Sequence, residues 1–372
     1  MGAYLARVKA PMTPGGRAQK ARAALANSGL ASSGSDSEAE PEKKAAAASS
    51  TSQPRDAFLA PMCTDGISVL TWNVAAINNN PFEYWISYED PTYLELMQGV
   101  ECFLDDPREH DVAVEEVFTE EMFRELIGLL EDSGMDEGLR ELEEQCWRGG
   151  ELHLAKRHIV SEFIKDRSFG AKRLISMPDR VTNTLNVVTR KDSVYRPPPV
   201  CRPSVINNFE GDLSCKEVWW DQWKKFMFID KVTLRTRKGT AVKRPVELLE
   251  PILRSKYPAV SELEERLTIP LQVLCQAIFD AVIVYFMNQL SPESKWQVVK
   301  GKICERLYRQ KHTLTMSILS RRYMAVDVMC LQEVAVVFKD TFKESPLAAT
   351  HEIILPLKLD EKRDQNSLII AK

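Results

Sequence analysis

The stretch that most constrains the fold of this chain is residues 327–334, where the apolar run Val-Met-Cys-Leu leads into Gln332 and Glu333. An uninterrupted apolar run is typical of a strand that is buried on both faces of a mostly parallel sheet. In open α/β sheets, ligands bind beyond the carboxyl ends of the strands, and Glu333 occupies such an end. We therefore predict a buried strand that brings a carboxylate to a functional site.

A second stretch, residues 67–74, has the same construction, because its apolar segment runs into Asn73. Between the two stretches, Ser291 and the Pro that follows it are residue types that begin a helix, and a helical pattern continues to Ile318. A helix that leads directly into a strand is the second half of a βαβ crossover, which places its two strands side by side and parallel. We expect Asn73 and Glu333 to form the two halves of one site.

Three motifs, in this order, resemble those of a known family: LTWNV at residues 70–74, DVMCLQEV at residues 327–334 and RDQNSLIIAK at residues 363–372. They are similar to the first strands of the endonuclease/exonuclease/phosphatase superfamily, whose members are metal-dependent phosphoesterases. The resemblance implies a catalytic role for Asn73 and a Mg²⁺ (or Mn²⁺) ligand in Glu333. It also implies that Gln332 holds Glu333 in position without itself contacting the metal ion.

The resemblance implies the fold class as well: an α/β protein of the two-layer α+β kind, with a large, mostly helical insertion. The family's later Asp-x-Asn and Asp-His motifs have no counterpart in this sequence, and His351, the one histidine after Glu333, does not stand at a matching place. We therefore expect the chain to be an N-terminal fragment or truncated form of the family's sandwich, without its general base.

Four segments follow from these patterns: a disordered tail at residues 1–57, a first strand and loop at residues 58–85, a mostly helical insertion at residues 86–318, and second and third strands at residues 319–372. The tail is rich in Ala, Ser, Gly and Pro and contains little that forms a core. Residues 271–290 are strongly apolar but are interrupted by polar side chains, which favours a buried helix of the insertion over a transmembrane segment.

The eight cysteines are spread along the chain without a Cys-x-x-Cys pair. This usage is typical of buried thiols in a reducing compartment and not of a disulfide framework or a zinc site, which indicates an intracellular protein of the cytoplasm or nucleus. Residues 1–35 contain Lys and Arg and no acid, so this segment is either an organelle-targeting peptide or a plain tail. The net charge of −4 indicates no overall commitment to nucleic acid or to an anionic membrane.

Two functions remain as alternatives. The resemblance implies a Mg²⁺-dependent hydrolase that acts on a phosphodiester or phosphomonoester, and the basic residues 152–202 and aromatic loop 77–85 favour a nuclease with a nucleic-acid substrate. In the alternative, the chain is a non-catalytic scaffold that retains a vestigial phosphoesterase half-domain and binds protein partners through its helical insertion. A continuation of the reading frame into the missing motifs would favour the enzyme.

Overall fold

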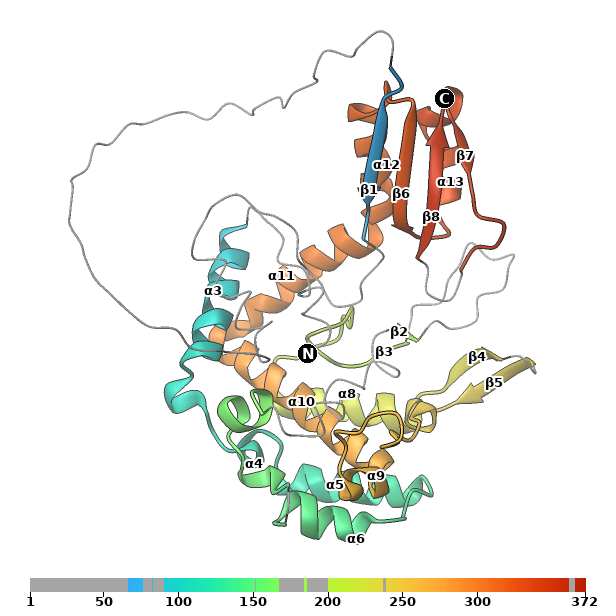
Figure 1. Cartoon of the computed structure of the whole chain (residues 1–372). Coiled ribbons are helices and arrows are strands. Elements are labelled where there is room, and N and C mark those ends of the chain that lie inside the picture. The colour runs from blue at the N-terminus through green and yellow to red at the C-terminus, as the bar shows by residue number, and fades with distance from the viewer. Residues whose placement is uncertain are drawn as a thin grey trace, which may run out of the picture. The chain divides into compact units, whose positions relative to one another are not determined.

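The structure is a computed structural model that describes residues 66–75, 82, 90–150, 152–166, 184–185, 200–236, 239–360 and 365–372. These residues are a mixture of helix and sheet, an α+β protein (Figure 1). They divide into a helical unit within Asn78–Tyr308 and a sheet unit that combines residues of Ala31–Ile77 with Arg309–Lys372. The predicted tail at residues 1–57 lies outside the described residues, as does the loop at residues 77–85 apart from Phe82.

The sheet unit contains a four-stranded sheet in the order β1-β6-β8-β7. Its strands are β1 (Val69–Asn73), β6 (Val328–Val334), β7 (Glu352–Ile354) and β8 (Asn366–Ala371). Strands β1 and β6 are parallel neighbours, which confirms the predicted pairing, and β8 pairs with both β6 and β7 in antiparallel orientation. The two strands of the first two motifs are therefore adjacent although about 260 residues separate them.

Helices cover one face of this sheet. Helix α12 (Lys311–Arg322) and helix α13 (Phe338–Lys343), followed by the 3₁₀ helix η11 (Pro346–Ala349), pack on the inward side chains of the strands. The core that they form consists of Met316, Leu319, Met329, Leu331, Val334, Phe338, Phe342, Leu347, Leu368 and Ile370. Because α12 packs here, the structure assigns residues 309–318 to the sheet unit, whereas the sequence patterns assigned them to the insertion.

The opposite face of the sheet is open among the described residues. Val69 is 64% exposed and Ile354 is 54% exposed, and Cys330 of β6 is half-buried. The prediction that β6 is buried on both faces is therefore wrong for the described part of the chain. Successive side chains of a strand point to opposite faces, and a helical layer covers only the face that carries Met329 and Leu331.

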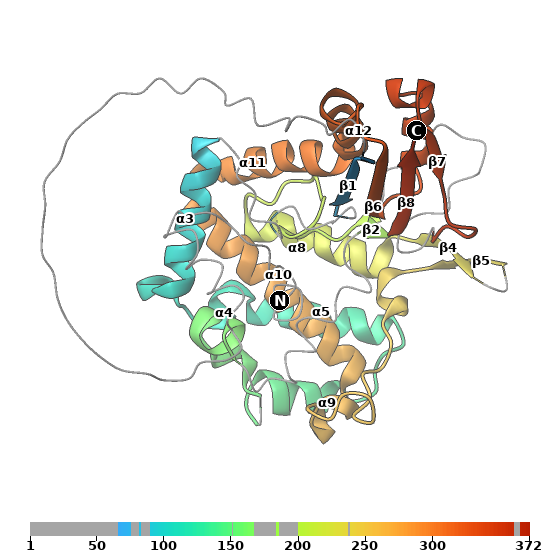
Figure 2. The same ribbon diagram turned by 45° about the horizontal axis from the view of Figure 1, so that its top comes forward.

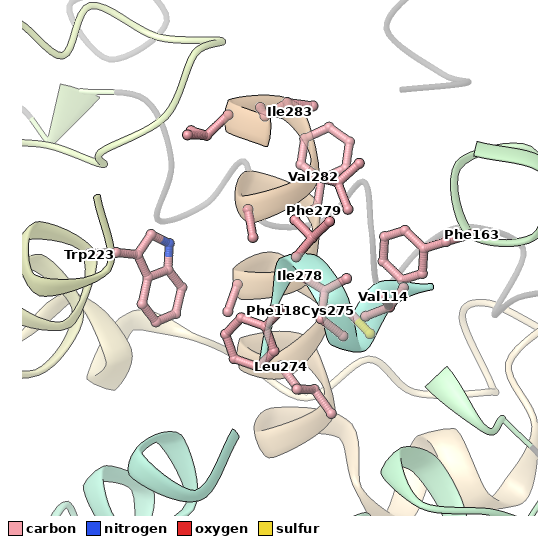
Figure 3. Packing of buried hydrophobic residues seen from close by; sticks show 14 of the residues in the cluster. Val114, Phe118, Phe163, Trp223, Leu274, Cys275, Ile278, Phe279, Val282 and Ile283 are labelled. Atoms are coloured by element: carbon pink, nitrogen blue, oxygen red, sulfur yellow. The ribbon is translucent and has the colours of Figure 1, made fainter. Parts of the chain in front are cut away.

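The helical unit is organised around helix α10 (Thr268–Leu290), which is apolar on all sides. Around it lie α3 (Pro91–Asp105), α4 (Val114–Val117), α5 (Glu120–Asp132), α6 (Leu139–Glu141), α8 (Lys216–Lys224), α9 (Glu262–Arg266) and α11 (Lys295–Cys304). Figure 3 shows part of their common core: Val114, Phe118, Phe163, Trp223, Leu274, Cys275, Ile278, Phe279, Val282 and Ile283. A helix that is hydrophobic all round belongs inside a protein or inside a membrane.

Helix α10 is long and apolar enough to cross a membrane by length and composition, but 89% of its most apolar window is buried inside the protein. The surrounding helices therefore supply the apolar environment that the sequence requires. This agrees with the prediction of a buried helix in place of a transmembrane segment.

The predicted helix from Ser291 to Ile318 is wrong as one continuous element. After α10, the 3₁₀ helix η9 (Pro292–Ser294) contains two consecutive residues with left-handed backbones, Glu293 (φ 59°) and Ser294 (φ 54°). Helix α11 begins only at Lys295, and α12 begins as a separate helix at Lys311 after a π-helical turn, η10 (Glu305–Arg309). The left-handed residues delay the start of the helix to Lys295, and the π-helical turn with the bend at Gln310 separates α11 from α12.

The helical unit also contains two small sheets. Strands β2 (Thr184–Leu185) and β3 (Val200–Cys201) form one, and β4 (Val232–Thr236) and β5 (Gly239–Lys243) form the other, both antiparallel. The sequence patterns predicted neither of them. The seven described cysteines are free thiols; Cys146, Cys275 and Cys304 are buried as predicted, whereas Cys102 is exposed and Cys201, Cys215 and Cys330 are half-buried.

Candidate functional site

The parallel pairing of β1 and β6 brings the two predicted site residues together. In the register of the sheet, Asn73 lies beside Gln332, the neighbour of Glu333. The side-chain amide of Asn73 donates a hydrogen bond from Nδ2 to Oε1 of Glu333 at 3.2 Å. Asn73 is exposed and Glu333 is half-buried, so the pair lies at the surface of the sheet unit, at the carboxyl ends of both strands.

The orientation of the Asn73 amide is set by its other end. Its Oδ1 accepts a hydrogen bond from the backbone N–H of Ala75 at 2.9 Å, the local turn that Asn side chains favour. Ala75 itself has a left-handed backbone with φ 55°. Because the main chain engages the oxygen, the side-chain nitrogen of Asn73 points to Glu333 and donates a hydrogen bond to its carboxylate.

A β-bulge at the end of β6 determines where the Glu333 carboxylate points. Leu331 pairs with Leu368 of β8, and Val334 pairs with Asn366, so three steps along β6 match two along β8. Glu333 has φ 56°, a left-handed conformation that costs a non-glycine residue on the order of 1–3 kcal/mol. Bulges redirect side chains and are frequent beside active sites. Apolar patterning in the sequence contained no signal for this bulge.

Gln332 does not turn toward Glu333. Its amide nitrogen lies 3.3 Å from the Thr71 hydroxyl oxygen, as a donor, and donates to the backbone carbonyl of Cys330 at 3.0 Å. The contact with Thr71 links β6 to β1, whereas the bond to Cys330 lies within β6 itself. In the structure Gln332 thus holds the two strand ends together, and the predicted support of Glu333 through a direct contact stays a prediction.

Lys311 is a site residue that the sequence patterns did not single out. It is the first residue of α12, and its ammonium group donates a hydrogen bond to the backbone carbonyl of Ala75, in the turn that follows Asn73. Burial lowers the pKa of Lys311 to about 8, while the negative charge of Glu333 acts to raise it. At neutral pH the site therefore combines one carboxylate with one partly buried positive charge.

The side chains at this site offer a cation one protein carboxylate, the smallest number that commonly holds Mg²⁺. Mg²⁺ is commonly held by one or two protein carboxylates, with water and substrate phosphate in the remaining positions. Glu333 supplies one carboxylate, and the described residues contain no group of three His, Cys, Asp or Glu side chains placed to hold a metal ion. His351 is not a candidate ligand in this structure, because its Nε2 contacts the Val326 carbonyl oxygen at 2.9 Å inside the sheet unit.

The comparison with known families concerns a different part of the chain. Residues 111–301, just over half of the sequence, match the family described as Domain of unknown function (DUF8234). The chain belongs to this family. The DUF8234 region contains α10 and most of the helices that pack on it, whereas Asn73, Gln332 and Glu333 lie outside the matched residues. No curated protein and no solved structure matches the chain.

Proposed function

We propose that this protein is a Mg²⁺-dependent (or Mn²⁺-dependent) phosphoesterase of the endonuclease/exonuclease/phosphatase kind, with nucleic acid as the favoured substrate. The observation that supports the proposal most is the hydrogen bond between Asn73 and Glu333 across two parallel strand ends. The two residues stand 260 positions apart in the sequence, and the parallel pairing of β1 and β6 brings their side chains into contact at one edge of the sheet. In this proposal the sheet unit is the first part of the family's sandwich, and the DUF8234 region is an insertion in it.

Each residue has a separate task in the proposed reaction. Glu333 would hold the cation through a hard carboxylate oxygen, and Asn73 would keep that carboxylate in position through its amide. The bound cation supplies neutralisation of charge on the phosphate oxygens. Lys311 adds a positive charge from the protein itself, near the Ala75 carbonyl, which attracts an anionic ester to the same strand ends.

The test is hydrolysis of a chromogenic phosphodiester and phosphomonoester, bis(p-nitrophenyl) phosphate and p-nitrophenyl phosphate, and of a labelled oligonucleotide by the full chain. We expect slow hydrolysis of at least one substrate with Mg²⁺ or Mn²⁺, because the family's general base has no counterpart in this sequence, and none with a chelator. Glu333→Gln should reduce the rate roughly 10²–10³-fold, the usual effect of losing a charge-stabilising group. The exposed Glu344, at the end of α13, offers a matched control as Glu344→Gln, which should retain the full rate.

A second candidate function is a protein scaffold, and one observation favours it. The largest buried core of the described residues belongs to the helical unit, which contains the DUF8234 region, and the proposed site offers a single carboxylate. A scaffold requires no metal ion at Glu333. Hydrolysis that is absent with every substrate and both metals, or that is equal in wild type and Glu333→Gln, would contradict the phosphoesterase and support the scaffold.

A further inference from the structure

The β-bulge at Glu333 is held by groups that the proposed reaction does not use. Strands β6 and β8 lie side by side in both views of the molecule, and the bulge lies where their register shifts, between Leu331 and Val334 (Figures 1 and 2). Glu333 itself has a left-handed backbone. Such a conformation persists in a non-glycine residue only where the surrounding structure determines it. Neighbouring groups must therefore fix the main chain on either side of Glu333.

The main chain before Glu333 is fixed by the end of β1. The carbonyl oxygen of Gln332 accepts a hydrogen bond at 3.0 Å from the backbone N–H of Val74, the residue that follows β1. The side chain of Asn73 donates to the Glu333 carboxylate at 3.2 Å. The end of β1 thus holds Glu333 from one side, and the main chain after Glu333 needs a separate attachment.

The main chain after Glu333 is fixed by the side chain of Asn366, the first residue of β8. Its amide nitrogen Nδ2 donates a buried hydrogen bond to the carbonyl oxygen of Val334 at 3.1 Å. Its Oδ1 accepts a hydrogen bond from the backbone N–H of Asp360 at 2.8 Å, and Nδ2 lies 3.5 Å from the carbonyl oxygen of the same residue. The amide of Asn366 is therefore engaged by main-chain groups, one of which belongs to the residue that follows Glu333.

Asn366 occupies a strand position where packing alone favours an apolar side chain. The side chains of β8 alternate between a buried and an exposed face, and Asn366 shares the buried face with Leu368 and Ile370. It is 6% exposed. Burying an amide is unfavourable unless the amide is hydrogen-bonded, so a leucine here would serve the core at least as well. What the amide adds is its hold on the main chain of Val334 and Asp360.

We propose that Asn366 is a positioning residue of the cation site, whose amide holds the Val334 carbonyl and so keeps Glu333 in the left-handed conformation of the bulge. The inference rests on the proposed function, because it takes Glu333 as the cation ligand. In this role Asn366 acts through Glu333 and not directly on the cation or the substrate. Hydrogen-bonding groups behind a metal ligand orient that ligand, and their loss weakens metal binding roughly 10–100-fold.

The experiment is a calorimetric titration of the full chain with Mn²⁺. Asn366→Leu has a side chain of the same branched shape without the amide, and Asn366→Ala is smaller and cannot clash. Both should bind Mn²⁺ about 10-fold more weakly than the wild type. The matched control is His351→Ala, which removes another buried polar side chain of the sheet unit, one that contacts the Val326 carbonyl oxygen just before β6 begins. This control should lower the melting temperature and leave the Mn²⁺ affinity unchanged.

A second measurement uses the wild-type chain and does not depend on how the variants fold. Coupling between two sites is reciprocal, so a cation that binds through a positioned Glu333 must also stabilise the hydrogen bond of Asn366. Hydrogen exchange of the Asn366 side-chain amide can be followed by NMR. It should become about 10-fold slower at saturating Mg²⁺, the same factor by which loss of the amide weakens binding.

Three results would overturn the inference and leave the cation site intact. The first is a Mn²⁺ affinity of the Asn366 variants that equals that of the wild type. The second is an equal loss of affinity in His351→Ala, which would mean that any loosening of the sheet unit weakens the site. The third is side-chain exchange that Mg²⁺ does not slow. A wild-type chain that binds no Mn²⁺, or that binds it as tightly after Glu333→Gln, would instead overturn the cation site and the inference with it.

Discussion

The substitution Asp280→Asn tests how the core of the DUF8234 region holds a buried charge. Arg202 and Asp280 form an ion pair with Nε and Oδ2 separated by 3.3 Å, and their side chains are 1% and 0% exposed. The same Oδ2 accepts a hydrogen bond from the indole of Trp223 at 3.0 Å. Nε and Nη1 of Arg202 have no hydrogen-bond partner among the described residues, so attraction to Asp280 is what offsets the burial of this guanidinium.

Asparagine keeps the shape of the side chain and an oxygen for Trp223, but it removes the negative charge. Arg202 is then buried without its carboxylate, and removing one partner of a buried pair lowers the free energy of unfolding by about 3–5 kcal/mol. Urea unfolding followed by tryptophan fluorescence measures this loss. With a dependence of about 2–3 kcal/mol per molar urea, the midpoint should fall by roughly 1–2.5 M.

The second arm of this experiment removes both charges. Arg202→Met/Asp280→Asn leaves no buried ion, so it should recover most of the stability that Asp280→Asn loses, because replacing a whole buried pair is often nearly neutral. A loss below about 1 kcal/mol for Asp280→Asn would refute the reasoning, since it would mean that the guanidinium is effectively solvated. A double variant as unstable as the sum of the single variants would refute it as well.

Three further predictions concern charges and caps. Hydrogen bonds from the Ser68 hydroxyl and backbone, with Lys372 nearby, lower the pKa of Asp327 from 3.8 to about 2. The ionised carboxylate therefore stabilises the folded state fully above pH 4, and this contribution is lost as the pH falls toward 2. Asp327→Asn should remove this acid dependence when the free energy of unfolding is measured against pH. Burial lowers the pKa of Lys300 to about 8, so the unfolded state binds more protons than the folded state between pH 8 and 10.5. The free energy of unfolding of the wild type should therefore rise over that range relative to that of Lys300→Met. Parallel plots of unfolding free energy against pH for the two proteins would contradict this. The Thr119 hydroxyl accepts from the N–H of Met122 at the start of α5, and Thr119→Ala should cost about 1 kcal/mol in thermal unfolding, with an unchanged melting temperature as the contrary result.

The parts of this fold that were predictable carry strong local patterns. The apolar runs before Asn73 and Glu333 indicated strands, and the helix-then-strand order indicated their parallel pairing, which the structure contains. Helix α10 was recognisable as a core element because its polar residues are too frequent for a lipid environment and its apolar residues cover all sides. The N-terminus of α5 also follows local rules, because Thr119 accepts a hydrogen bond from the N–H of Met122 and two acids stand in the first turn.

The parts that were missed depend on contacts between distant segments. The bulge at Glu333 depends on a register shift between β6 and β8, in which three steps along β6 match two along β8. Nothing in the residues of β6 indicates this register. Lys311 reaches the turn after Asn73 through the packing of α12 on the sheet, while in the sequence it was one of many lysines on a helix. Strands β4 and β5 were not predicted because their apolar residues are few: in β4 only Val232 and Leu234 alternate with polar residues, over one short stretch.

The measurement that tests the central claim most directly is a calorimetric titration of the full chain with Mg²⁺ or Mn²⁺. If Glu333 is the cation ligand and Asn73 holds it in position, the wild-type chain should bind the ion, Asn73→Ala should bind it more weakly, and Glu333→Gln should show no binding at this site. Glu344→Gln should bind as the wild type does. Equal affinity in the wild type and in Glu333→Gln would contradict the account and remove Glu333 from the site.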